Sequence, residues 1–149
     1  MIAVSITTPN RNSLTNRTQI RSIVRTILQG EGIDDAAISI AFVDDATSHR
    51  INKQFLDHDE ATDVITFPLS DPNGDRLEGE LVISLDYARS QAKERGHDAS
   101  AELALYVIHG LLHLCGYDDK TKPARREMRR REAHYLDELS LPPIADKER

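Results

Sequence analysis

Residues 109–119 read His-Gly-Leu-Leu-His-Leu-Cys-Gly-Tyr-Asp-Asp and are the most informative stretch of this chain. Their first part is the end of an apolar run that extends from Leu103 to Cys115. A helix that is apolar on nearly all sides is typical of the centre of a fold. The stretch therefore predicts a buried, central helix over about residues 98–114, which stops at Gly116 because glycine favours the backbone conformation of a helix C-terminus.

Two histidines on this helix form a candidate metal site. His109 and His113 are four residues apart, so their imidazoles share one face of the helix. Asp119 follows three residues after Gly116 and could return a carboxylate to the same ion. Such a set leaves a fourth tetrahedral position open for water, as in catalytic zinc sites. The alternative is a pair of satisfied core histidines followed by a helix cap, and Asp118 is a rival third ligand.

Strand and helix patterns alternate along the rest of the chain. Period-two or β-branched runs predict strands over residues 2–7, 38–43, 63–67 and 80–85. Helical patterns predict a helix through residues 20–28, another after Asp44 or Asp45, one capped by Asp86 and running to about 95, and a last one from Pro123 to about 139. The first two strands are expected to be parallel, and the last two antiparallel.

Length and composition favour one soluble globular domain over residues 1–149, with a loose tail at 140–149. The chain is 39% hydrophobic and 30% charged. Its single cysteine excludes an internal disulfide framework. There is no apolar run of about 18 residues and no pattern of a signal peptide, so we expect a cytoplasmic protein without a membrane span.

The spacing of the two histidines, the glycine and Asp119 is similar to that of the metzincin metalloproteases. Those enzymes carry a glutamate, the general base, directly after the first histidine. Gly110 stands at that position here, so protease chemistry of that kind lacks its base. We expect Gly110 to open space beside the metal instead.

A closer resemblance is to the YbeY family of metal-dependent endoribonucleases, the rRNA maturation factors of bacteria. Their signature reads His-Gly-x-Leu-His-Leu-x-Gly-Tyr-Asp-His. The matching residues are His109, Gly110, Leu112, His113, Leu114, Gly116, Tyr117 and Asp118. The runs at 62–68 and 79–84 also resemble family segments, so the likeness extends over nearly the whole chain. Asp119 stands where the family usually has its third histidine.

The resemblance implies an α+β fold with a four-stranded mixed sheet, about five or six helices, a central metal-bearing helix and a metalloprotease-like catalytic domain. It implies a zinc-dependent endoribonuclease that cleaves single-stranded RNA, with one Zn²⁺ on His109, His113 and Asp119. The expected role is maturation of ribosomal RNA, at the 16S rRNA 3′ end, and ribosome quality control. A metzincin-like protease and a non-catalytic ribosome assembly factor with a structural metal are the alternatives.

Some family members carry an arginine, thought to serve RNA, where this chain has Leu56. A basic segment offers a substitute. Residues 120–131 contain seven basic side chains and one acidic one, Glu127, which gives this segment +6 and leaves −12 for the rest of a chain of net charge −6. Such a segment beside a metal site could hold phosphates, although an ordinary solvated helix face is the competing interpretation. The candidate RNA-binding residues are Lys120, Lys122, Arg125, Arg126, Arg129 and Arg130.

Overall fold

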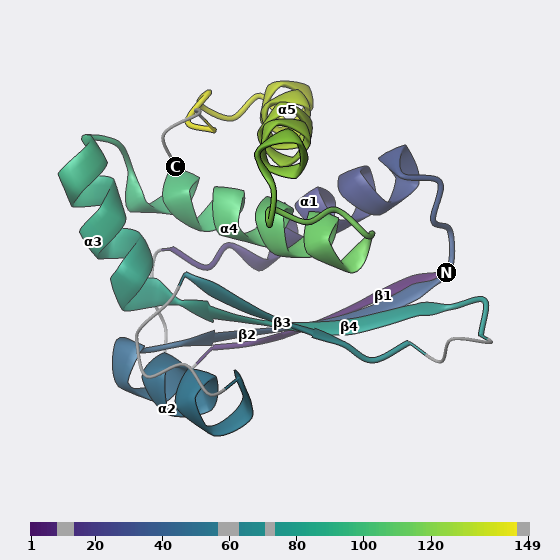
Figure 1. The fold of residues 1–149 in the computed structure, drawn as a ribbon, viewed down its shortest axis with the longest axis horizontal. Coiled ribbons are helices and arrows are strands. Elements are labelled where there is room, and N and C mark those ends of the chain that lie inside the picture. Colours follow the sequence, from purple (N-terminus) through teal and green to yellow (C-terminus); the bar gives the residue numbers. More distant parts are fainter. Residues whose placement is uncertain (9–13, 57–62, 71–73, 146–149) are drawn as a thin grey trace.

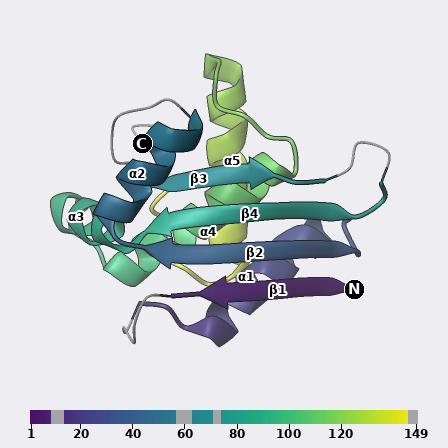
Figure 2. The same cartoon turned by 90° about the horizontal axis from the view of Figure 1, so that it is seen from below.

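The computed structural model describes residues 1–8, 14–56, 63–70 and 74–145. Its centre is a four-stranded sheet in the order β1-β2-β4-β3, which Figure 2 shows face-on. The strands are β1 (Ile2–Thr7), β2 (Ala36–Val43), β3 (Val64–Pro68) and β4 (Leu77–Ser84). β1 pairs with β2 and β2 with β4 in parallel, whereas β3 runs antiparallel to β4. The predicted mixed sheet is confirmed.

Five helices occur among the described residues: α1 (Arg17–Gly30), α2 (Asp45–Leu56), α3 (Leu85–Arg95), α4 (Ala99–Leu114) and α5 (Lys122–Glu138). Figure 1 shows α1, α3 and α4 on one face of the sheet and α2 alone on the other. α5 lies on the outer side of α4. The predicted central helix is therefore α4, enclosed between the sheet and α5.

Burial follows the apolar pattern of the sequence. α1 buries residues at helical spacing, Ile20, Ile23, Val24, Ile27 and Leu28, and α4 buries eleven of its sixteen residues. α4 is covered on most sides because β3 and β4 lie beneath it, α1 and α3 flank it and α5 packs above it. None of the described helices combines the length and hydropathy that crossing a membrane would require.

Three expectations about the elements need correction. β4 begins at Leu77, three residues earlier than predicted. α3 is capped by Ser84, whose Oγ accepts a hydrogen bond from the Tyr87 N–H at 3.1 Å, while Asp86 lies within the first turn. In the expected loose tail, Leu141 and Ile144 pack against the core, so this part of the chain is not loose. Residues 146–149 lie outside the described part.

Candidate metal centre

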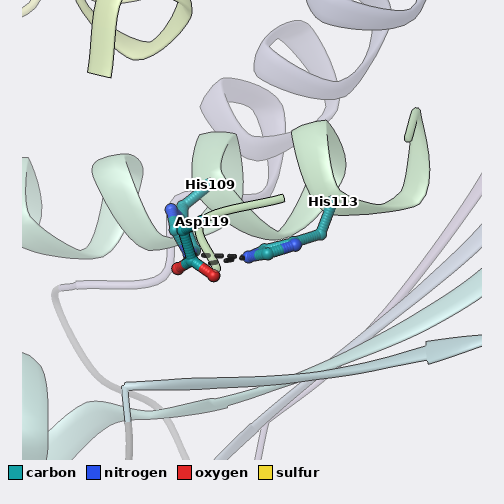
Figure 3. Close-up of side chains that lie close together, drawn as sticks. All are labelled: His109, His113 and Asp119. Carbon is teal, nitrogen blue, oxygen red and sulfur yellow. Dashed lines mark hydrogen bonds and ion pairs between the residues drawn. The ribbon is translucent and has the colours of Figure 1, made fainter. Parts of the chain in front are cut away.

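The two histidines project from the last turns of α4 toward one another and toward the loop that follows the helix (Figure 3). Their Nε2 atoms are 3.1 Å apart. The side chain of His109 is 12% exposed and that of His113 is 27% exposed, so both rings are shielded but reachable from solvent. The predicted i, i+4 pair is present as an open site at the helix surface.

A sharp turn after α4 returns Asp119 to the histidines. Gly116 has φ +106°, a backbone angle that residues other than glycine rarely adopt. Asp119 Oδ2 then lies 3.8 Å from Nε2 of each histidine. Asp118 does not join the cluster, because its Oδ1 accepts a hydrogen bond from the Lys120 N–H at 3.1 Å within the turn.

The three donor atoms fit a single divalent ion. Ligand atoms about 2.0–2.2 Å from a tetrahedral zinc ion lie roughly 3.3 Å from one another. The separations here, 3.1 Å and 3.8 Å, bracket that distance. His109, His113 and Asp119 also form the one group of metal-ligating side chains found within the described ranges. Imidazole nitrogens with a carboxylate oxygen suit zinc, and the donor set therefore fits the predicted ion.

A buried carboxylate fixes the ring of His109, and the sequence analysis missed it. Glu132 of α5 is fully buried, and its Oε2 accepts a hydrogen bond from His109 Nδ1–H at 2.6 Å. A carboxylate can only accept here, so the His109 proton sits on Nδ1 and the Nε2 lone pair faces the site. Oε1 of the same carboxylate accepts a hydrogen bond from Arg129. Glu132 thus links the candidate metal site to a cation of the basic segment.

A signal for Glu132 was present in the sequence. Met128, Tyr135 and Leu136 form the buried stripe of α5, and Glu132 lies on the same stripe, one turn from Met128. A carboxylate on the apolar face of a helix needs a buried partner. Glu132 was overlooked because the many charged residues around it made this part of the helix resemble a solvent-exposed face.

The ring of His113 is held in its neutral, metal-binding form. Burial lowers its pKa, and the neighbouring His109 lowers it further, against the attraction of Asp119 and a hydrogen bond to the Tyr117 backbone. Metal ligation requires an unprotonated imidazole. At neutral pH the ring is therefore ready to bind an ion.

A second polar network anchors the loop that carries Asp119. Glu31, at the C-terminal end of α1, accepts hydrogen bonds from Tyr117 at 2.7 Å, from Arg131 at 2.5 Å and from Tyr135. Burial alone would raise the pKa of Glu31, but the hydrogen bonds from Tyr135, Tyr117 and Arg131 outweigh it and lower the pKa. One carboxylate thereby ties α1, the loop and α5 together.

The expectation for Gly110 was wrong. A Cβ at this position would lie 2.8 Å from Leu81 Cδ2 and 3.2 Å from Val64 Cγ2. Gly110 therefore faces β3 and β4 and lets α4 approach the sheet closely. It provides no space at the metal site.

Comparisons with known proteins identify the family of this chain. A model of the endoribonuclease YbeY family matches residues 5–140. The chain belongs to the YbeY endoribonuclease family. A relative from Rhodopirellula baltica that carries the name endoribonuclease YbeY is 41% identical over 140 residues, 90% of this chain and 71% of the relative. One of the same name from Pelotomaculum thermopropionicum is 40% identical over 122 residues, 77% of this chain and 80% of the relative.

A solved structure shares the fold. The solution structure of TM1509 from Thermotoga maritima is similar with a TM-score of 0.67 and 27% sequence identity, over 93% of this chain and 89% of that protein. The family resemblance seen in the residues 109–119 is confirmed.

The structure gathers most of the candidate RNA-binding residues in one place. A groove of about 540 Å³ runs along α5 and is lined by Lys122, Arg125, Arg126, Arg129 and Arg130, but not by Lys120. Two of these cations have carboxylate partners, since Arg130 pairs with Glu127 at 2.6 Å and Arg129 with Glu132. Leu56 is the last residue of α2.

Proposed function

We propose that this chain is an endoribonuclease that cleaves single-stranded RNA with one zinc ion bound by His109, His113 and Asp119. The observation that supports this most directly is the convergence of the three donor atoms at the end of α4, in a chain of the YbeY family. Ribosomal RNA in the cytoplasm is the proposed substrate, with the 16S rRNA 3′ end as the processed site. Ribosome quality control is the proposed wider role, and the ribosome is the proposed partner.

The chain's own residues supply orientation. Glu132 holds Nδ1–H of His109 at 2.6 Å, so that Nε2 can act as a ligand. A bound zinc ion would lower the pKa of a water molecule or polarise a phosphoryl oxygen. Water and the 2′-hydroxyl of RNA are both nucleophiles compatible with the site. The products distinguish them, because attack by the 2′-hydroxyl leaves a 2′,3′-cyclic phosphate.

The basic residues Lys120, Lys122, Arg125, Arg126, Arg129 and Arg130 are proposed to hold the RNA backbone. The support for this proposal is the groove along α5, which five of them line. Contacts between cations and phosphates release counterions, so RNA affinity should fall steeply with salt. A solvated helix face without an RNA role would show no such dependence on these residues.

The test is cleavage of an unstructured RNA oligonucleotide by the purified protein, with and without a chelator, beside His113→Ala and Asp119→Ala. We expect zinc to restore cleavage to the chelated wild type, and both variants to lose zinc binding and activity. Cleavage that persists in chelator and in His113→Ala would overturn the proposal. Unchanged zinc affinity in Asp119→Ala would remove Asp119 from the ligand set.

The same preparations separate the alternatives. A metalloprotease would cleave an unstructured peptide in a zinc-dependent manner and leave the RNA intact. A non-catalytic assembly factor would bind zinc and RNA without cleaving either substrate, and its loss of zinc would lower thermal stability only.

A further inference from the structure

A cavity of about 210 Å³ adjoins the candidate metal site on its α3 side. His109 and Asp119 line one end of it, and Arg129 of α5 reaches its wall. Tyr106 of α4 and Asp63, directly before β3, also line the cavity, and α3 contributes three polar residues, Tyr87, Gln91 and Arg95. The mechanism described above uses none of these three residues.

The three α3 residues form one stripe of side chains. They are spaced four apart, so they lie above one another along one side of α3, next to the buried Ala88 and Ala92. Within the stripe, Arg95 Nε donates a hydrogen bond to Gln91 Oε1 at 3.4 Å. Tyr87 is half-buried and packs against Tyr106 of α4, with ring centroids 6.3 Å apart. The aromatic ring is thus held by the fold beside the metal ligands.

The chemistry of this stripe matches a nucleotide. Unstacked RNA bases bind by stacking on aromatic or guanidinium groups and by hydrogen bonds to their edges. Tyr87 supplies the ring, Gln91 an amide and Arg95 a cation. The volume is smaller than the roughly 300–1,000 Å³ of sites for drug-sized ligands, which limits the cavity to one nucleotide unit.

Arg129 connects this cavity to the basic groove. It lines both the 210 Å³ cavity and the groove along α5. Its guanidinium is oriented by Glu132, which also holds His109. A single strand that follows the groove therefore passes Arg129 and the metal ligands before it reaches α3.

We propose that Tyr87, Gln91 and Arg95 form a subsite for the nucleotide next to the scissile phosphate, with the base stacked on Tyr87. The subsite deepens the proposed endoribonuclease function and rests on it. It adjoins the α5 groove at Arg129, which lines both. One RNA strand then contacts the groove and the subsite together.

The test pairs a protein variant with a modified substrate. A single abasic ribonucleotide is placed at each position around the cleavage site of a short RNA, and KM is measured for the wild type and for Tyr87→Leu. Stacking of one base contributes about 5–150-fold in affinity. In the wild type we expect one position, adjacent to the cleaved bond, where the abasic unit raises KM about tenfold or more. In Tyr87→Leu the same unit should cause no further loss, and Tyr87→Phe should behave as the wild type.

A charge-matched pair on α3 provides the control. Arg95→Gln should raise KM and weaken the salt dependence, whereas Arg89→Gln should change neither. Arg89 is on the same helix, pairs with Asp86 at 3.5 Å and is outside the cavity lining. Thermal unfolding and zinc stoichiometry of each variant establish that the fold and the metal site are intact.

Equal abasic penalties in the wild type and Tyr87→Leu at every position would overturn the subsite while leaving the endoribonuclease function in place. If the wild type cleaves no RNA, the proposed function fails, and fluorescence anisotropy with the same oligonucleotides decides the subsite separately. An abasic penalty in binding that depends on Tyr87 then supports the subsite, and absence of RNA binding, or zinc-dependent cleavage of a peptide instead, overturns it.

Discussion

Glu132→Gln tests whether the buried carboxylate of α5 controls the metal site. The carboxylate of Glu132 accepts two hydrogen bonds, one from His109 Nδ1–H at 2.6 Å and one from Arg129. Glutamine has almost the same shape but offers one acceptor oxygen and one NH₂ group. Arg129 is always a donor, and His109 is a donor at Nδ1 in its metal-binding tautomer, so when the ion is bound the NH₂ group faces a donor and one hydrogen bond is lost in a fully buried position.

The magnitude follows from this loss. Removing a carboxylate that orients a metal-bound histidine lowers metal affinity about 10–100-fold, which corresponds to about 1.4–2.8 kcal/mol. We expect a drop of this size in the zinc affinity of Glu132→Gln. Neutral hydrogen bonds in place of those to the carboxylate should also lower the unfolding free energy of the metal-free protein, by about 1 kcal/mol.

The assay is a competition titration of zinc against a chromophoric chelator at constant pH, with urea unfolding of the same metal-free samples. Glu127→Gln is the matched control, because Glu127 is on the same helix and pairs with Arg130 at 2.6 Å, but that pair is on the surface. The control should keep wild-type zinc affinity. A folded Glu132→Gln protein that binds zinc within twofold of the wild type would refute the reasoning.

Three further predictions concern other parts of the fold. The pKa of Glu31 is lower in the folded protein than the reference value of 4.5 for the unfolded chain. Ionised Glu31 therefore stabilises the fold at pH values above 4.5, and this stabilisation is lost as the pH falls below 4.5 toward the folded-state pKa. The gap in urea midpoint between the wild type and Glu31→Gln should therefore narrow under acid, and a gap that is constant with pH would contradict this. Gly110→Ala should lower the melting temperature by about 2–4 °C, because the clash of the new Cβ with Leu81 at 2.8 Å costs more than the gain of about 1 kcal/mol in helix propensity. Calorimetry measures the melting temperature. An increase would show that the Leu81 side chain moves aside without cost. Lys122→Gln with Arg126→Gln should reduce the slope of log RNA affinity against log salt by about 0.7 per lost phosphate contact, whereas an unchanged slope would make the groove an ordinary surface.

The elements of the fold could be predicted because their signals are local. The apolar faces of α1 and α4, and the alternation of apolar and polar residues in β1, can each be recognised within one short segment of sequence. The His109–His113 pair follows from helical spacing alone. Asp119 could be predicted because only a short turn separates it from the helix. Each of these inferences needs a segment of fewer than twenty residues.

The contacts that complete the site join distant segments. Glu132 is 23 residues from His109, and Glu31 is 86 residues from Tyr117. Such pairings depend on how α1, α4 and α5 pack, which periodicity does not specify. Ser84 was missed for another reason, since serine and aspartate are both good caps, and the end of β4 decides which of them precedes the helix.

The close approach at Gly110 also limits which chemistries this scaffold can acquire by mutation. A glutamate there would have to displace Leu81 and Val64 before its carboxylate could serve any reaction, because even one added carbon meets both side chains. Conversion to the metzincin pattern therefore requires coordinated changes in β3 and β4 rather than a single substitution in the motif. The packing beneath the helix thus acts as a barrier between two kinds of hydrolase whose metal ligands are spaced alike.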